Sequence, residues 1–228
     1  MKTMSLTTFV VCILSFLSLA TNRVESYEKA EIYCLSIQGE FDEIASTYDL
    51  DYRNIIPIIF PECTRINEFS DQMETTALEY FYVNYGSDGA DFSIGNFQMK
   101  PSFIEDLEQY IPSLDFTETQ KNQFNFLAKT TKEKRAERVA RLSDITWQIH
   151  YLCLFYKVMD HRFPEIIWQN NQERLSFYAA AYNYGFLSTE KVIRNWESKS
   201  QFGIDEFGNA VSYSNVALDY YLKIKGHE

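Results

Sequence analysis

The stretch that decides the fold class is DITWQIHYLCLFYKVMDHRF, residues 144–163. Apolar side chains recur along it at steps of four and three residues, which is the spacing of one face of an α-helix. The positions concerned are Ile145, Ile149, Leu152, Tyr156, Met159 and Phe163. Pro164 follows directly, and a proline ends or kinks a helix because it lacks a backbone donor. The pattern predicts a helix over 144–163 that packs along one face.

Helical spacing dominates the rest of the chain as well, and it predicts helices over about 54–62, 71–85, 103–110, 117–128, 172–184 and 213–225. Residues that favour helix starts and ends stand at the boundaries: Ser70 or Asp71, Ser102, Thr117 with Gln120, Ser212, Gly86 and Gly185. Residues 91–101 show neither a helical period nor strand alternation, which predicts an irregular loop or short β-hairpin. The predicted fold class is therefore mostly α.

The first twenty residues have the features of a secretory signal peptide. Lys2 supplies a positive charge, and residues 9–20 form an almost unbroken apolar run that ends in small residues at Ala20. Ser26 offers a second cleavage position. We expect residues 1–20, or at most 1–26, to be removed on export to the periplasm or medium, leaving 27–228 as a single domain. No later stretch is long and apolar enough to predict a transmembrane segment.

The charge balance argues against nucleic acid as a partner. The formal net charge is −11, and loss of Lys2 with the signal peptide makes it −12. Phosphate binding needs clustered Lys and Arg side chains that release counterions. The one basic segment, residues 129–141, interleaves Glu133 and Glu137 at helical spacing. We interpret it as a solvated helix face with ion pairs between neighbouring turns.

Four segments carry a resemblance to a known family. They are ASTYDLDYRNIIPIIFPE (45–62), GNFQMKP (95–101), the helix over 145–163, and AAYNYG (180–185). In this order they resemble the lytic transglycosylases of the lysozyme-like superfamily, the soluble type of glycoside hydrolase family 23. AAYNYG is the most specific of the four. The resemblance covers nearly all of the chain after the signal peptide and implies a lysozyme-like helical domain, with the 91–101 segment lining a cleft.

The resemblance implies an activity and a set of site residues. Glu62 would be the single catalytic acid/base that cuts the MurNAc-GlcNAc β-1,4 bond of peptidoglycan glycan strands and leaves 1,6-anhydro-MurNAc ends. Gly95, Gln98, Tyr182 and Asn183 would bind the substrate. The apolar residues before Glu62 favour this role, because an apolar pocket raises the pKa of a carboxyl group. No cofactor or metal ion is implied.

Departures from the family leave alternatives open. Glu62 is followed by Cys63 where the family has serine, and Pro57 and Pro61 stand in the helix before it, so that Pro61 is expected to kink or end the helix at the carboxylate. Glu79 and Glu74 are alternative catalytic residues. A hydrolytic muramidase would use a second carboxylate, for which Asp88, Asp91 or Glu74 is available. A non-catalytic peptidoglycan-binding protein with the same fold is the third alternative.

The cysteines and histidines give little support for a metal site. Cys34, Cys63 and Cys153 remain after the signal peptide, without a CxxC pair, and the chain has only three histidines. Three cysteines allow one disulfide at most. We expect Cys34 to pair with Cys153, because Cys63 adjoins Glu62.

Overall fold

A computed structural model describes residues 25–65, 79–204 and 210–226, and this part of the chain is mostly α-helical, as predicted. Residues 25–36 and 79–85 are helical. The remaining helices are α2 (Gln38–Ser46), α3 (Tyr52–Cys63), α5 (Pro101–Glu108), the 3-10 helix η1 (Ile111–Ser113), α6 (Glu118–Gln123), α7 (Thr131–Leu142), α8 (Ile145–Arg162), α9 (Asn171–Tyr184), α10 (Glu190–Glu197) and α11 (Tyr213–Lys225). The strands β1 (Gly203–Ile204) and β2 (Ala210–Val211) pair antiparallel.

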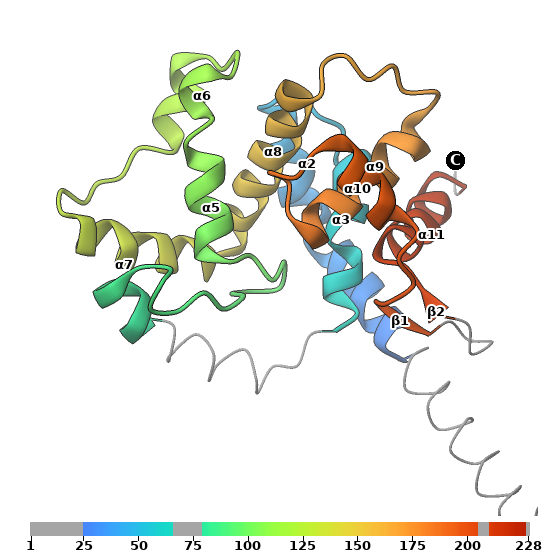
Figure 1. The fold of residues 1–228 in the computed structure, drawn as a ribbon, viewed down its shortest axis with the longest axis horizontal. Helices are drawn as coiled ribbons and strands as arrows, with labels where there is room; N and C mark the ends of the chain where they lie inside the picture. The colour runs from blue at the N-terminus through green and yellow to red at the C-terminus, as the bar shows by residue number, and fades with distance from the viewer. Residues whose placement is uncertain (1–24, 66–78, 205–209, 227–228) are drawn as a thin grey trace, which may run out of the picture.

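Helix α8 connects two groups of helices. Helices α5, α6 and α7 lie on one side of it and helices α3, α9, α10 and α11 on the other (Figure 1). On the second side, α3 packs against both α9 and α11, while α5, α7 and α2 each contact α8. The two groups therefore meet along α8, and residues far apart in the sequence come together there.

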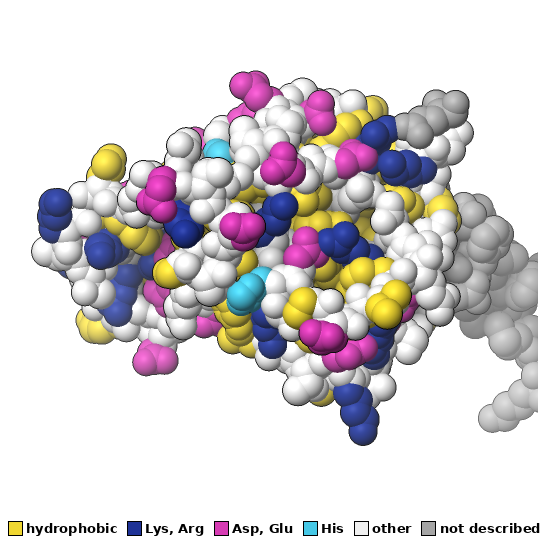
Figure 2. Space-filling model, turned by 90° about the horizontal axis from the view of Figure 1, so that it is seen from above, with side chains coloured by type: hydrophobic (Ala, Val, Ile, Leu, Met, Phe, Trp, Pro, Cys, Tyr) yellow, Lys and Arg dark blue, Asp and Glu magenta, His cyan; other side chains and the backbone are white. Residues whose placement is uncertain are grey.

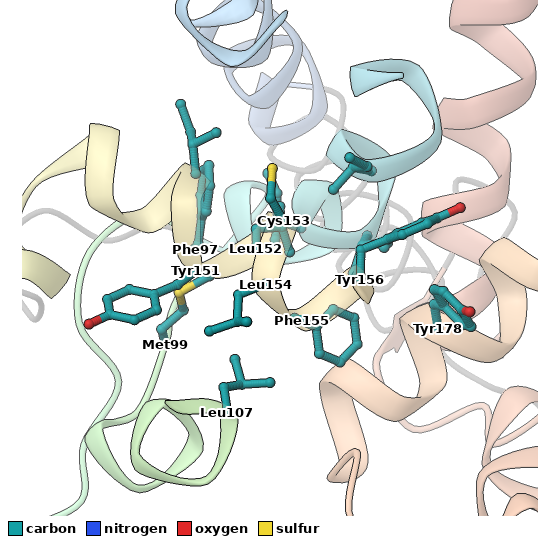
Figure 3. Packing of buried hydrophobic residues seen from close by; sticks show 14 of the residues in the cluster. Phe97, Met99, Leu107, Tyr151, Leu152, Cys153, Leu154, Phe155, Tyr156 and Tyr178 are labelled. Atoms are coloured by element: carbon teal, nitrogen blue, oxygen red, sulfur yellow. The ribbon is translucent and has the colours of Figure 1, made fainter. Parts of the chain in front are cut away.

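The helix predicted from residues 144–163 is confirmed, but its packing along one face is not. The side chain of Asp144 accepts a hydrogen bond from the Trp147 amide and so begins α8. From Ile149 to Met159 nearly every side chain is buried, and Figure 3 shows them radiating toward several neighbouring elements. A helix covered on most sides belongs to the centre of a core, which explains its apolar composition.

Other predicted helices are confirmed with changed ends. Thr117 and Gln120 form the predicted capping box, but α6 ends at Gln123 and not near Ala128. Helix α5 begins at Pro101 and not after Ser102, because proline is well suited to the first helical position. Ser212 begins α11 as predicted. Of the helix predicted over 71–85, residues 79–85 are helical and the others lie outside the described residues, as does the predicted signal segment 1–20.

The predicted disulfide is wrong. Cys34, Cys63 and Cys153 are free and buried. Cys153 lies in the middle of α8, whereas the Cys34 thiol lies beside Cys63 at the end of α3. Burial raises the pKa of the Cys63 thiol well above its usual range, and the neighbouring Cys34 adds to the effect. The thiol of Cys63 is therefore neutral.

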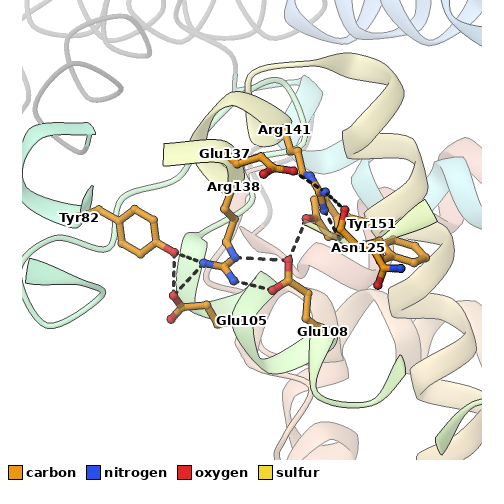
Figure 4. Close-up of polar contacts among 9 residues, drawn as sticks. Tyr82, Glu105, Glu108, Asn125, Glu137, Arg138, Arg141 and Tyr151 are labelled. Carbon is orange, nitrogen blue, oxygen red and sulfur yellow. Dashed lines mark hydrogen bonds and ion pairs between the residues drawn. The ribbon is translucent and has the colours of Figure 1, made fainter. Parts of the chain in front are cut away.

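The interpretation of residues 129–141 as a solvated face is also wrong in part. Thr130 caps α7 with Glu133, and Glu137 pairs with Arg141 one turn later, as the spacing indicated. However, Arg138 and Arg141 are buried. Arg138 reaches into the space between α7 and α5 and pairs with Glu105 and Glu108 (Figure 4). These carboxylates lie some thirty positions earlier in the chain, so a local pattern could not show them.

Within the described residues, no helix combines the length and apolar character needed to span a lipid bilayer.

Candidate active site

A cleft of about 670 Å³ lies where the two groups of helices meet. The end of α3, the segment before α5, α5 itself and the connection from α9 to α10 form its wall. The lining residues are Glu62, Arg65, Asp91, Ser93, Gln98, Met99, Lys100, Ser102, Phe103, Asp106, Tyr182, Asn183, Tyr184, Gly185, Phe186, Leu187 and Ser188. Three of the four predicted substrate-binding residues therefore share one cleft with the predicted catalytic glutamate.

Glu62 occupies the last turn of α3. The Asp51 side chain accepts a hydrogen bond from the Arg53 amide and begins this helix. The helix includes both prolines and ends at Cys63, one residue beyond Glu62, so it ends at the carboxylate as expected. The residues that precede Glu62, from Ile55 to Pro61, are all buried. Helix α3 therefore runs from the core to the cleft and places the Glu62 carboxyl group at the edge of the cleft.

Burial raises the pKa of Glu62 to about 7. Removal of a carboxylate from water penalises its charged form, and this is the largest contribution. The positive charge of Arg65 and a hydrogen bond with Tyr213 act in the opposite direction. Within the described residues Glu62 forms no ion pair. The carboxyl group thus exchanges its proton close to neutral pH, which is the property that a general acid/base needs.

Tyr213 is a site residue that sequence reasoning missed. It is the first residue of α11, it is buried, and its hydroxyl donates to the Ile58 carbonyl at 2.9 Å. The same hydroxyl lies close enough to the Glu62 carboxyl group to act on its pKa. Tyr213 begins the predicted helix over 213–225, but it lies about 150 positions after Glu62, and a local pattern does not indicate a contact over that separation.

The predicted irregular segment 91–101 forms a tight turn beside Glu62. An isolated bridge joins Ile94 to Met99, and Gln98 adopts a positive φ of 52° while its side-chain amide donates to the Gly95 carbonyl at 3.0 Å. The Phe97 amide donates to Gln148 of α8 at 2.9 Å. These bonds hold the Gln98 backbone in a conformation that ordinary residues rarely adopt.

Gly95 does not lie on the cleft wall, although a substrate contact was predicted for it. Its φ is +68°, and a Cβ atom placed there would lie 2.1 Å from the side-chain amide nitrogen of Gln148. The missing side chain makes room for Gln148 and not for a ligand. Gly95 therefore shapes the turn that presents Gln98.

Tyr182 and Asn183 come from the last turn of α9. The Tyr182 hydroxyl donates to the Phe97 carbonyl at 2.6 Å, and its ring contacts Phe103 edge-on. Burial raises the pKa of Tyr182 well above its usual range, and the charge of Glu62 adds to this. Tyr182 therefore connects α9 to the Gln98 turn. Asn183 is exposed on the wall, available to a ligand.

The other candidate carboxylates differ in position. Asp91 lines the cleft, but its two oxygens accept hydrogen bonds from the Ser102 amide at 3.0 Å and the Ser102 hydroxyl at 2.8 Å. Asp88 and Glu79 are exposed and lie outside the cleft wall, and Glu74 lies outside the described residues. Asp106 of α5, which was not predicted, lines the cleft. Burial raises its pKa, and the charges of Glu105 and Asp91 add to this.

Cys63 stands where the family that the sequence resembles has serine. Cys63 is not among the residues that line the cleft. Its side chain is buried, and its Sγ atom lies 3.9 Å from the Asn96 carbonyl oxygen. The contact joins the end of α3 to the Gln98 turn. No group of three or more His, Cys, Asp or Glu side chains in the described residues is arranged to hold a metal ion.

Comparison with protein-family models, with curated proteins and with solved structures gives no match to this chain. The function is therefore inferred from the geometry of the cleft and from the four sequence segments.

Proposed function

We propose that this chain is an exported lytic transglycosylase that cleaves the MurNAc-GlcNAc β-1,4 bond of peptidoglycan with Glu62 as its one acid/base. The observation that carries the proposal is the Glu62 carboxyl group, whose pKa is raised to about 7 in a cleft that also presents Gln98, Tyr182 and Asn183. Export through the signal segment 1–20 is part of the proposal, because the substrate lies outside the cytoplasmic membrane. N-terminal sequencing of the secreted protein tests that part.

In the first step Glu62 acts as an acid. Its proton passes to the oxygen of the glycosidic bond while positive charge develops on the sugar ring. With a pKa of about 7, roughly half of the molecules carry this proton at neutral pH. The buried stretch of α3 before Glu62 maintains this fraction, since it excludes the water that would stabilise the carboxylate.

In the second step the same group acts as a base. The carboxylate accepts the proton of the muramic acid 6-hydroxyl, whose oxygen attacks C1 and closes the 1,6-anhydro ring without using water. Arg65 and Tyr213 favour the ionised form of Glu62, so they stabilise the carboxylate between the two steps. Burial favours the acid and these two neighbours favour the base, which gives one residue both roles.

The cleft wall offers groups that suit a sugar chain. The Gln98 and Asn183 amides supply donors and acceptors for hydroxyl and N-acetyl groups. Tyr184 also lines the cleft and is 46% exposed, and its ring lies against Trp196 with the centroids 4.3 Å apart and the planes tilted by 37°. A tyrosine ring held in this way presents an apolar face with a polar tip, which is the surface that a sugar ring covers.

One observation favours hydrolysis as the second candidate. Asp106 lies in the same cleft as Glu62, and an inverting hydrolase needs a second carboxylate about 6.5 to 9.5 Å from the first to activate water. Asp91 is less suited to this role, because both of its oxygens already bind Ser102. The products separate the two mechanisms, since an anhydro end lacks one water relative to a hydrolysed end.

The test is digestion of purified sacculi followed by mass spectrometry of the soluble products. We expect anhydro-muropeptides from the native chain and a loss of at least about 100-fold in rate for Glu62→Gln. Glu79→Gln is the matched control, because it makes the same chemical change at an exposed residue outside the cleft. Products with reducing ends would favour the hydrolase. A Glu62→Gln variant that cuts at the native rate, or a native chain that releases no muropeptide at any pH, would overturn the proposal.

A further inference from the structure

Arg65 is a cation on the wall of the cleft without an ion-pair partner among the described residues. Its side chain is exposed, and its guanidinium carbon lies 4.6 Å from the centroid of the Phe202 ring. A cation over an aromatic face is held in place while its N–H donors stay free for another partner. The only other cation of the wall in this part of the chain, Lys100, lies 4.0 Å from an Asp91 oxygen.

The position of Arg65 relative to Glu62 is fixed by the backbone. Its amide donates to the Glu62 carbonyl at 2.9 Å in the turn that follows α3. The guanidinium is close enough for its charge to act on the Glu62 carboxyl group. A ligand group that binds Arg65 therefore belongs to the sugar unit at the cleaved bond or to its immediate neighbour.

Arginine in such a position selects carboxylates. The planar guanidinium donates two parallel hydrogen bonds to a carboxylate, and charge-assisted bonds of this kind are about twice as strong as neutral ones. The chain itself is strongly acidic, with a net charge of −11. An arginine in the cleft without an ion-pair partner among the described residues thus offers an anionic ligand a local attraction in a protein of net negative charge. On the face shown in Figure 2, acidic side chains lie among the basic ones.

We propose that Arg65 binds a carboxylate carried by the muramic acid unit, and that it makes the cleft specific for peptidoglycan over uncharged N-acetylglucosamine polymers. The inference rests on the proposed function. Two carboxylates fit this chemistry. One is the lactyl group of muramic acid in strands without stem peptides, and the other belongs to the stem peptide, whose attachment converts the lactyl group to a neutral amide.

Binding of a ligand carboxylate to Arg65 should change the pKa of Glu62. Five charged or titratable groups meet here: Glu62, its neighbour Cys63, Arg65, Tyr182 from α9 and Tyr213 from α11. Of these, Arg65 carries the positive charge that lowers the Glu62 pKa. A carboxylate on Arg65 would cancel that charge, so the pKa of Glu62 would rise and its proton would be retained until the substrate is in place.

The experiment is calorimetric titration in a Glu62→Gln background, which prevents turnover. Three tetrasaccharides serve as ligands: alternating GlcNAc and MurNAc with free lactyl groups, the same sugar with stem peptides, and chitotetraose with no carboxylate. We expect Arg65→Gln to weaken binding of at least one acidic ligand by about tenfold or more, and of chitotetraose by less than about twofold. The affected acidic ligand identifies which carboxylate is bound.

Lys100→Gln is the matched control, because it removes the same charge from the same wall at a residue that faces Asp91. It should change the preference for acidic ligands by less than about twofold. Arg65→Lys should restore part of the preference, since it keeps the charge and loses the bidentate geometry. Circular dichroism of each variant confirms folding, which an exposed side chain should not alter.

A second readout needs no cleavage activity. In carbon-13 NMR of the native chain, N-acetylmuramic acid should raise the titration midpoint of Glu62 and N-acetylglucosamine should not, and Arg65→Gln should abolish the difference. Equal loss of all three tetrasaccharides on Arg65→Gln, or no loss of any, would overturn the inference while leaving the proposed function in place. Failure of the Glu62→Gln chain to bind any of the three would overturn both.

Discussion

Two regions of this molecule contain buried ionisable side chains. They differ in whether the buried group has an ion-pair partner. Between α5 and α7, Arg138 donates to Tyr82 at 2.5 Å, to Glu105 at 3.1 Å and to Glu108 at 2.6 Å, and Tyr151 donates to Glu108 at 2.9 Å (Figure 4). At the cleft, Glu62 forms no ion pair among the described residues.

The partners of a buried group, more than its burial, decide whether it keeps its charge. Burial lowers the pKa of the Arg138 guanidinium, but its bonds to Glu108 outweigh this, and the pKa rises. Burial raises the pKa of Glu62 to about 7, because Arg65 and Tyr213 compensate only in part. The first region is arranged to hold charges permanently, and the second is arranged to exchange a proton.

The largest effect is expected where the paired charges are broken. Arg138→Met should lower the free energy of unfolding by about 3 to 5 kcal/mol, because it leaves two carboxylates facing a region without their cation. Chemical denaturation at pH 7 measures this. Combining it with Glu105→Gln and Glu108→Gln should recover a large part of the loss. If Arg138→Met alone costs less than about 1 kcal/mol, water already solvates Arg138 and its two carboxylates.

Glu62→Gln should raise the free energy of unfolding, which is the opposite of the effect of Arg138→Met. The Glu62 pKa lies above its ordinary value of 4.5, so between pH 4.5 and 7 the unfolded chain loses this proton while the folded chain keeps it. The contribution of Glu62 to the free energy of unfolding therefore falls over this range and is constant above it. The variant avoids the loss and should be more stable at pH 8 by up to about 3 kcal/mol, with little advantage near pH 4.5. An advantage that is the same at pH 5 and pH 8 would contradict this.

Asp91→Ala tests whether the second cleft carboxylate is structural. Because Asp91 binds the Ser102 amide and hydroxyl at the start of α5, its loss should cost about 0.5 to 2 kcal/mol in thermal or chemical unfolding. Cleavage of sacculi should persist at temperatures where the variant is folded. Loss of cleavage in a variant with native stability would assign Asp91 to the chemistry.

Glu79→Gln should have the smallest effect. Glu79 is exposed and lies outside the cleft wall, so the free energy of unfolding should change by less than about 0.5 kcal/mol at pH 5 and at pH 8. The comparison with Glu62→Gln uses the same chemical change in two environments. A pH-dependent change at Glu79 would show that it, too, is buried against an apolar surface.

Much of the fold could be predicted from the sequence, because helix patterns are local. The start of α8 at Asp144, the capping box at Thr117 and Gln120, and the end of α9 before Gly185 each depend on residues within a turn or two. The burial of Arg138 could not be predicted in this way, since its carboxylate partners lie in another helix. The same limit explains the wrong pairing of Cys34 with Cys153.

The candidate site was predictable to a similar extent. The segments that contain Glu62, Gln98 and Tyr182 were identified from the sequence, and the structure brings them to one cleft. Tyr213 and Asp106 could not be found, because their relevance comes only from the packing of α11 and α5 around that cleft. The role of Gly95 changed because Gln148, more than fifty positions away, fills the space beside it.

The proposed chemistry requires Glu62 to carry a proton near neutral pH, and titration of its carboxyl carbon by carbon-13 NMR measures this. Labelled glutamate in the native chain, with Glu62→Gln to assign the signal, gives the midpoint without any substrate. We predict a midpoint of about 7. A midpoint near the ordinary value of 4.5 would contradict the account, because the group would then be a carboxylate throughout the neutral range.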